Sequence, residues 1–211
     1  MRRLATLLAT LPVAALLATA CARPAATPAA AADVTSAAAA RKIAAATATD
    51  DDDERYSVYD LDATWRDQHG RARTLASLRG RPRLVAMIYT HCATTCPLTV
   101  ADLKRVERET ADVDFVLVSL DPERDAPARL AAFAREHALG DDRWTLLAGR
   151  DDDEVRELAA ALGVRYRRLS PAELAHSNTL TLLDADGAVA WQRAGLGDDD
   201  ATVAAVHALA R

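Results

Sequence analysis

Cysteine is scarce in this sequence, which has three cysteines among 211 residues. So few cysteines cannot form the framework of a small disulfide-rich domain. A basic excess is also missing, because 26 lysines and arginines face 31 aspartates and glutamates, for a net charge of -5. Such a chain gains nothing from displacing counterions from a nucleic-acid backbone, so we expect no nucleic-acid partner.

Calcium-binding loops of the EF-hand kind are missing as well. Acidic residues cluster at positions 50–54, 151–154 and 198–200. None of these runs has the spaced Asp-x-Asp-x-Asp-Gly pattern that an EF-hand loop needs. We interpret them as solvated surface or as helix starts.

The N-terminal segment has the three parts of a secretory signal peptide. Two arginines precede an apolar run over residues 4–17, and Ala18-Thr19-Ala20 is a small-residue cleavage site. We therefore predict a signal peptide at residues 1–20 and an exported protein, periplasmic or otherwise extracytoplasmic. Cys21 would follow the cut directly, in a Leu-Ala-Thr-Ala-Cys sequence that resembles a bacterial lipobox. We predict that Cys21 is lipidated and tethers the protein to a membrane.

An uncleaved membrane anchor is the alternative for this segment. The run over residues 4–20 is somewhat shorter than the roughly 20 apolar residues that a bilayer core requires, and Pro12 weakens it further as a span.

Residues 21–54 are rich in alanine and almost free of large apolar side chains, so we expect a flexible tether there. The folded domain is then expected to occupy residues 55–211.

Strand-like and helix-like stretches alternate through the expected domain. The run over residues 83–89 is almost continuously apolar, as in a strand buried on both faces. The order predicts an α/β sandwich with a mixed central sheet in a thioredoxin-like arrangement, with two cysteines at a strand-to-helix corner. Strands are expected at 64–67, 71–75, 83–89, 114–119, 144–147, 179–183 and 188–192, and helices at 97–110, 127–137, 151–162 and 198–210.

The corner carries Cys92 and Cys96, four residues apart and followed by Pro97. On a helix or tight turn this spacing puts the two Cβ atoms roughly 5–6 Å apart, which suits either a disulfide or a shared metal ion. A helix N-terminus also lowers the pKa of a thiol. An inert structural disulfide is disfavoured, because so short a loop constrains the unfolded chain little.

The spacing separates the functional alternatives only in part. Thioredoxin-type enzymes usually have Cys-x-x-Cys, one residue shorter, and structural zinc requires four ligands. Two thiolates and one imidazole suit copper(I). His176 is the best candidate for the imidazole, because it is expected in a loop before a core strand that can bend back over the corner. The other four histidines are expected to have ordinary surface or interface roles: His69, His91, His137 and His207.

Three ordered motifs resemble the Sco/SenC family. They are Tyr89-Thr90-His91-Cys92-x-x-x-Cys96-Pro97, the run Val-Ser-Leu-Asp-Pro-Glu-Arg-Asp at 118–125, and His176-Ser177-Asn178 followed by Leu-Leu-Asp-x-Asp-Gly at 182–187. The resemblance covers about residues 56–211. It implies a thioredoxin-like domain facing the periplasm or intermembrane space, with one copper ion held by Cys92, Cys96 and His176.

The resemblance also implies a partner. Sco/SenC proteins deliver copper to, or reduce the cysteines of, the dinuclear CuA centre of respiratory oxidases. The expected partner is thus a copper-receiving oxidase subunit, or another periplasmic copper or thiol protein. Asp121 matches a family aspartate near the site and is expected either to support it or to serve as a turn residue before Pro122.

Two departures from the family pattern are visible. Ala93 stands where many members have proline, which is expected to alter the redox potential of the cysteine pair. The segment over residues 167–174 is compact, which is expected to alter partner recognition.

Two functional hypotheses remain open at this point. The leading one is a copper-binding accessory protein, a copper chaperone rather than an enzyme. The competing one is a membrane-tethered thiol-disulfide oxidoreductase, in which Cys92 and Cys96 attack a partner disulfide and form one themselves when oxidised. A peroxidase using the same corner has no separate support in the sequence.

Overall fold

The computed structural model describes residues 56–211. The predicted signal peptide at 1–20, the lipidation site Cys21 and the tether at 21–54 lie outside the described residues. Among residues 56–211, no helix combines the length and the apolar character needed to cross a bilayer.

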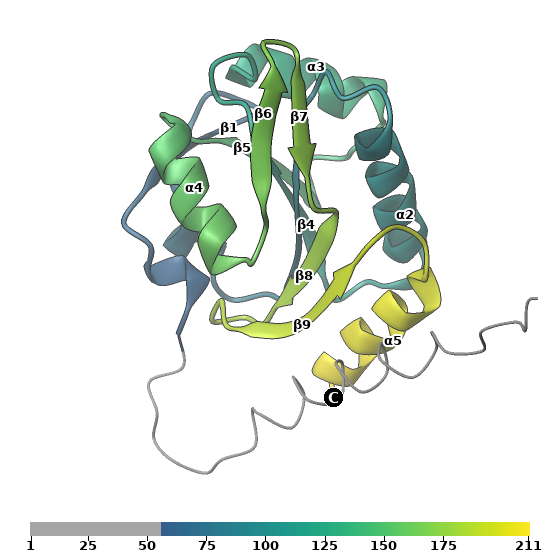
Figure 1. Ribbon diagram of the computed structural model, residues 1–211. Helices are drawn as coiled ribbons and strands as arrows, with labels where there is room; N and C mark the ends of the chain where they lie inside the picture. Colours follow the sequence, from purple (N-terminus) through teal and green to yellow (C-terminus); the bar gives the residue numbers. More distant parts are fainter. Residues whose placement is uncertain (1–55) are drawn as a thin grey trace, which may run out of the picture. The chain divides into compact units, whose positions relative to one another are not determined.

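A mixed seven-stranded sheet forms the centre of the domain, in the order β2-β1-β5-β4-β3-β8-β9 (Figure 1). The three inner strands β5, β4 and β3 run parallel, and the strands on either side of them pair antiparallel. The predicted α/β sandwich with a mixed sheet is confirmed. The strands are β1 (Thr64–Asp67), β2 (Ala72–Thr74), β3 (Arg83–Ile88), β4 (Asp114–Ser119), β5 (Trp144–Ala148), β8 (Thr179–Leu183) and β9 (Val189–Ala194).

The apolar composition of β3 and β4 explains their central place. Every residue of β4 is buried, and so is every residue of β3 after Arg83. Strands covered on both faces need apolar side chains on both, which is why their sequences do not alternate. Beside them Phe115 stacks on Trp144 with ring centroids 4.5 Å apart, so two of the few aromatic residues lie in the core.

Four α-helices cover the sheet. Helices α2 and α5 pack against each other, and α3 packs on β5. Asp151 caps α4, its side chain accepting a hydrogen bond from the amide of Glu154. The helices are α2 (Thr95–Glu109), α3 (Pro127–Glu136), α4 (Asp152–Ala161) and α5 (Asp199–Leu209), and two short 3-10 helices are η1 (Val58–Asp60) and η2 (Leu75–Leu78).

Helix α2 begins at Thr95 and not at Pro97 as predicted. The amides of the first turn of a helix have no partner within the helix, so proline fits at its third position as well as at its first. Because the helix begins at Thr95, Cys96 lies inside its first turn, and Cys92 lies in the loop before it.

A two-stranded hairpin, β6 (Tyr166–Ser170) with β7 (Glu173–His176), was not predicted. Figure 1 shows it together with α4 in front of the main sheet. The expectation that His176 lies in a loop is wrong, because it is the last residue of β7. The strand β6 is half-buried at Tyr166 and exposed at its other residues, so its sequence lacks the apolar alternation by which strands are recognised.

Candidate metal centre

The two cysteines lie where the chain leaves the sheet. Strand β3 ends at Ile88, the loop turns with the amide of Cys92 donating to the carbonyl of Tyr89 at 3.1 Å, and α2 then begins. Cys92 is 6% exposed and Cys96 is fully buried. Both are free thiols, so this is the reduced form of the pair.

The environment of Cys92 favours a thiolate. Burial by itself would raise the pKa of this thiol, but the backbone amide of Cys96, the hydroxyl of Thr95 and the amide of Thr94 lower it to about 5. The amide nitrogen of Cys96 lies 3.4 Å from Sγ of Cys92, and the Thr95 hydroxyl lies 3.6 Å from it. Amides at the start of a helix stabilise an anion in this way.

Cys96 has the opposite character. Burial raises the pKa of its thiol far above the usual range, and the neighbouring Cys92 sulfur raises it further. In the metal-free reduced protein one sulfur is therefore a thiolate and the other a neutral thiol. A cation bound between them would favour deprotonation of both.

His176 reaches Cys96 from the hairpin. Its Nε2 lies 3.8 Å from Sγ of Cys96, and its Nδ1 lies 3.2 Å from the carbonyl oxygen of Ser177. A carbonyl oxygen only accepts hydrogen bonds, so in the neutral ring we assign the proton to Nδ1. The lone pair of Nε2 then faces the sulfur, the tautomer and orientation that a metal-ligating histidine needs.

Tyr89 supports this arrangement, and sequence reasoning did not assign it a role. Its ring meets the ring of His176 edge-on with centroids 5.9 Å apart, and its hydroxyl donates to the carbonyl of Leu174 at 3.2 Å. Burial raises its pKa to about 12, so the hydroxyl stays protonated and the donor is kept. Its position at the end of a buried strand, just before His91-Cys92, was the available signal.

The three predicted ligands are not yet closed around one point. Cys96 contacts both Cys92 and His176, but within residues 56–211 no three His, Cys, Asp or Glu side chains already form a metal-binding group. Two sulfurs and one unprotonated imidazole nitrogen are a donor set that fits copper(I).

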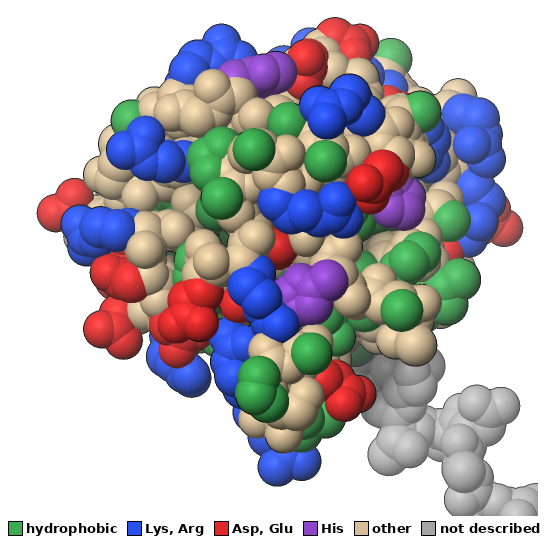
Figure 2. Space-filling view, turned by 90° about the horizontal axis from the view of Figure 1, so that it is seen from above, with side chains coloured by type: hydrophobic (Ala, Val, Ile, Leu, Met, Phe, Trp, Pro, Cys, Tyr) green, Lys and Arg blue, Asp and Glu red, His purple; other side chains and the backbone are tan. Residues whose placement is uncertain are grey.

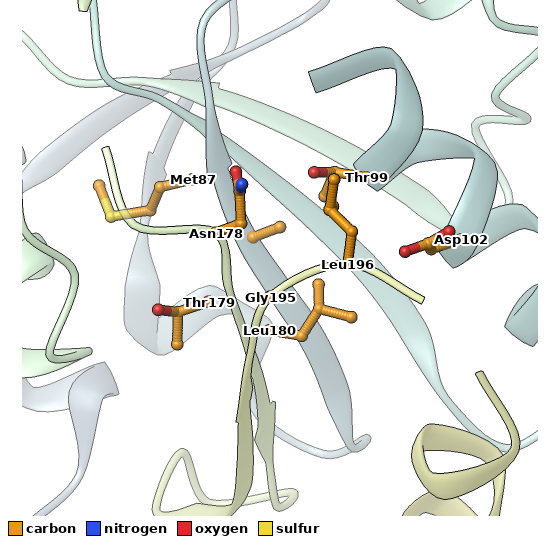
Figure 3. A pocket seen from close by; sticks show the side chains of 9 residues that line it. Met87, Thr99, Asp102, Asn178, Thr179, Leu180, Gly195 and Leu196 are labelled. Carbon is orange, nitrogen blue, oxygen red and sulfur yellow. The ribbon is translucent and has the colours of Figure 1, made fainter. Parts of the chain in front are cut away.

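His176 lines one hollow of the domain, and none of the three candidate ligands lines a second one. An open one of about 340 Å³ exposes His176 to solvent and is lined by Arg165, Arg167 and their neighbours. A second, of about 10 Å³, lies between Thr99 on α2 and Asn178 before β8 (Figure 3). It has room for about one water molecule, so it is not a substrate pocket.

The other four histidines do not reach the cysteines. His91 turns toward Asp121, with Nε2 3.3 Å from the carboxylate, as expected for a side chain that points away from the pair. His69 pairs with Asp141 at 3.0 Å. Figure 2 shows histidines on the surface seen from the top of Figure 1, each beside charged side chains. The remaining two are His137, packed on the ring of Phe133, and His207, exposed in the last turn of α5.

Asp121 belongs to the surroundings of the centre rather than to its donors. Its carboxylate is fully buried and is bonded by Arg124 and Arg168 as well as by His91. Burial alone would raise its pKa, but the two guanidinium groups lower it below its usual value. It is also a turn residue, since its carbonyl accepts from the amide of Asp125 at 2.9 Å. The expected turn role is therefore observed, and the expected support of the metal site stays a prediction.

Comparison with known proteins identifies the family. The SCO1 protein homolog of Bacillus subtilis (strain 168) is 31% identical over 132 residues, which cover 60% of this chain and 68% of the relative. Among solved structures, BsSco, described as a Sco-family cytochrome c oxidase assembly protein with a disulfide switch, has 28% identity and a TM-score of 0.62, covering 75% of this chain and 96% of its own. Copper-bound ScoI of Bradyrhizobium japonicum has 25% identity and a TM-score of 0.58, with 70% and 96% covered. Residues 44–211 match SCO1/SenC, and the chain therefore belongs to that family.

Proposed function

We propose that this protein binds one copper ion through Cys92, Cys96 and His176 and serves in assembly of the CuA centre of a respiratory oxidase. The observation that carries the proposal is the approach of Nε2 of His176 to Sγ of Cys96, 3.8 Å, with Sγ of Cys92 3.4 Å from the amide nitrogen of Cys96. Copper(I) accepts few ligands and favours sulfur, so this set suits it better than zinc or calcium.

Two relatives support the proposals that this protein binds copper and that its client is an oxidase subunit. The copper-bound ScoI shares the fold of this chain, and BsSco is described as a member of a family of cytochrome c oxidase assembly proteins. The expected client is a copper-receiving oxidase subunit, which would meet the centre on the side where His176 borders the open hollow.

The proposal includes the place of action. We propose that residues 1–20 direct export, that Cys21 carries a lipid, and that residues 21–54 tether the domain, from residue 55 onward, outside the cytoplasm. A tether of this length lets the centre reach a client in the same membrane.

Copper stoichiometry tests the proposal. Protein loaded with copper(I) under reducing conditions and then desalted should retain one copper per chain. His176→Ala combined with Cys92→Ser should abolish retention, because a single donor would remain. His69→Ala is the matched control, since that ring pairs with Asp141 and not with the cysteines. Full retention by the double variant would refute the proposed site.

A thiol-disulfide reductase is the second candidate, and one observation favours it. The low pKa of Cys92 beside the raised pKa of Cys96 is the pattern of an attacking thiolate with a buried resolving thiol. If reduction of partner cysteines is the main function, His176→Ala leaves the reductase rate intact while either cysteine variant abolishes it. If copper delivery is the main function, all three variants abolish delivery.

A further inference from the structure

The hairpin that carries His176 is not part of the main sheet. Strands β6 and β7 pair only with each other, as a separate two-stranded sheet within the described domain. The base of the hairpin is closed by the amide of Ser177, which donates to the carbonyl of Arg165 at 2.8 Å. No backbone ladder therefore joins the hairpin to the main sheet. Apart from its chain connections to α4 and β8, side-chain contacts hold it in place.

One face of the hairpin supplies those side chains. Tyr166 pairs with His176 and Arg168 with Leu174 across the strands, and alternate residues of a strand share a face. The hydroxyl of Tyr166 donates to Asp152 at 2.7 Å, and Leu174 is buried. Tyr166, Arg168, Leu174 and His176 thus face the domain together.

The carboxylate that Arg168 contacts also contacts the loop that carries Cys92. Nη2 of Arg168 lies 3.1 Å from Oδ1 of Asp121, whose other oxygen lies 3.3 Å from Nε2 of His91. His91 directly precedes Cys92. A single buried carboxylate thereby joins β6, the strand paired with the one that carries His176, to the loop that carries Cys92.

The carboxylate of Asp121 is buried, so it needs its ion-pair partners. Asp121 has no exposed side-chain surface, and a charge in that position is stable only when it is paired and hydrogen-bonded. Arg124, three residues away, also bonds it, with Nε at 2.8 Å. Arg124 belongs to the same turn, so it neutralises the carboxylate without holding the hairpin. Arg168 belongs to the hairpin, so its ion pair with Asp121 connects the hairpin to the rest of the domain.

We propose that Arg168 is a positioning residue, whose ion pair with Asp121 holds the hairpin so that His176 faces Cys96. The inference rests on the proposed copper function, because it assigns a role to a residue that supports one of the ligands. Residues that orient metal ligands from behind typically change metal affinity about 10–100-fold when they are removed.

The test compares two neighbouring arginines. Arg168→Ala should weaken copper(I) binding about 10–100-fold in a competition titration, and should weaken the nitrogen hyperfine coupling from His176 in the copper(II) spectrum. Arg167→Ala is the matched control, because Arg167 lies on the opposite face and pairs across the hairpin with Ala175. Arg124→Ala should keep the His176 signal, since it leaves the hairpin contact in place.

A metal-free measurement separates this inference from the proposed function. Amide hydrogen exchange of residues 173–176 in the apo protein should be faster in Arg168→Ala than in the wild type and unchanged in Arg167→Ala. If the wild type binds no copper, the proposed function fails, while this exchange experiment still tests whether the ion pair between Arg168 and Asp121 holds the hairpin. If Arg168→Ala does not fold, Arg168→Gln takes its place, and Arg168→Lys should restore part of the affinity. The inference would be overturned if a folded Arg168 variant kept the wild-type copper(I) affinity, the wild-type His176 hyperfine coupling and the wild-type rate of amide exchange.

Discussion

His176 and Cys96 are 80 residues apart in the sequence, and their Nε2 and Sγ atoms lie 3.8 Å apart in the fold. Two elements make this contact possible. The first turn of α2 presents Cys96 at the carboxyl end of a central strand, and the end of the β7 strand brings His176 over it. The proposed copper site depends on this contact more than on any other.

The pKa difference within the cysteine pair predicts selective alkylation. Cys92, with a pKa of about 5, is a thiolate at pH 7, whereas Cys96 stays protonated. Iodoacetamide at pH 7 should therefore label Cys92 first, and the rate should fall as the pH drops through about 5, where the thiolate takes up its proton. Mass spectrometry of the apo protein checks this. Thr95→Val removes one hydrogen-bond donor and should raise the midpoint, and a midpoint at an ordinary thiol pKa in the wild type would contradict the assignment.

The proposed lipidation of Cys21 predicts how a Cys21 variant would distribute between membrane and soluble fractions. Cys21→Ser should release the protein from the membrane fraction, because serine cannot accept the thioether-linked lipid. Cell fractionation and the mass of the mature N-terminus measure the effect. Retention of Cys21→Ser in the membrane would favour the uncleaved anchor over residues 4–20.

The turn between β8 and β9 predicts that replacing its glycine by alanine lowers the free energy of unfolding more than the same change at an open turn does. At Gly187, φ is +91°, and an added Cβ would collide with the ring of Tyr59. Gly187→Ala should cost about 2–4 kcal/mol, from left-handed strain plus overpacking. Gly70→Ala, where φ is +77° and the space is open, should cost only about 1–2 kcal/mol. Denaturant unfolding of both variants checks the order, and equal costs would show that the contact with Tyr59 is not tight.

The parts of the fold that were predicted share one property, local apolar patterning. The buried strands β3 and β4 and the amphipathic helices are determined by residues close in sequence, so their spans were correct to within a few residues. The cysteine corner followed from them, because a strand and a helix meet there. The start of α2 was missed by two residues since Pro97 suits several first-turn positions.

The hairpin β6–β7 could not be predicted in this way. Its position is fixed by contacts between residues far apart in sequence, such as Arg168 with Asp121 and Tyr166 with Asp152. For the same reason spacing alone could not choose among five histidines. The place of His176 just before a core strand made it the best candidate, and the resemblance to Sco/SenC proteins strengthened that choice. Tyr89, which contacts both His176 and the hairpin carbonyl of Leu174, was missed as well.

X-ray absorption at the copper edge is the most direct test of the central claim. Protein loaded with copper(I) should show two sulfur neighbours and one nitrogen neighbour around the metal, contributed by Cys92, Cys96 and His176. His176→Ala should lose the nitrogen and keep the sulfurs, whereas His69→Ala should leave the spectrum unchanged. A spectrum without sulfur neighbours, or one that His176→Ala does not alter, would contradict the account.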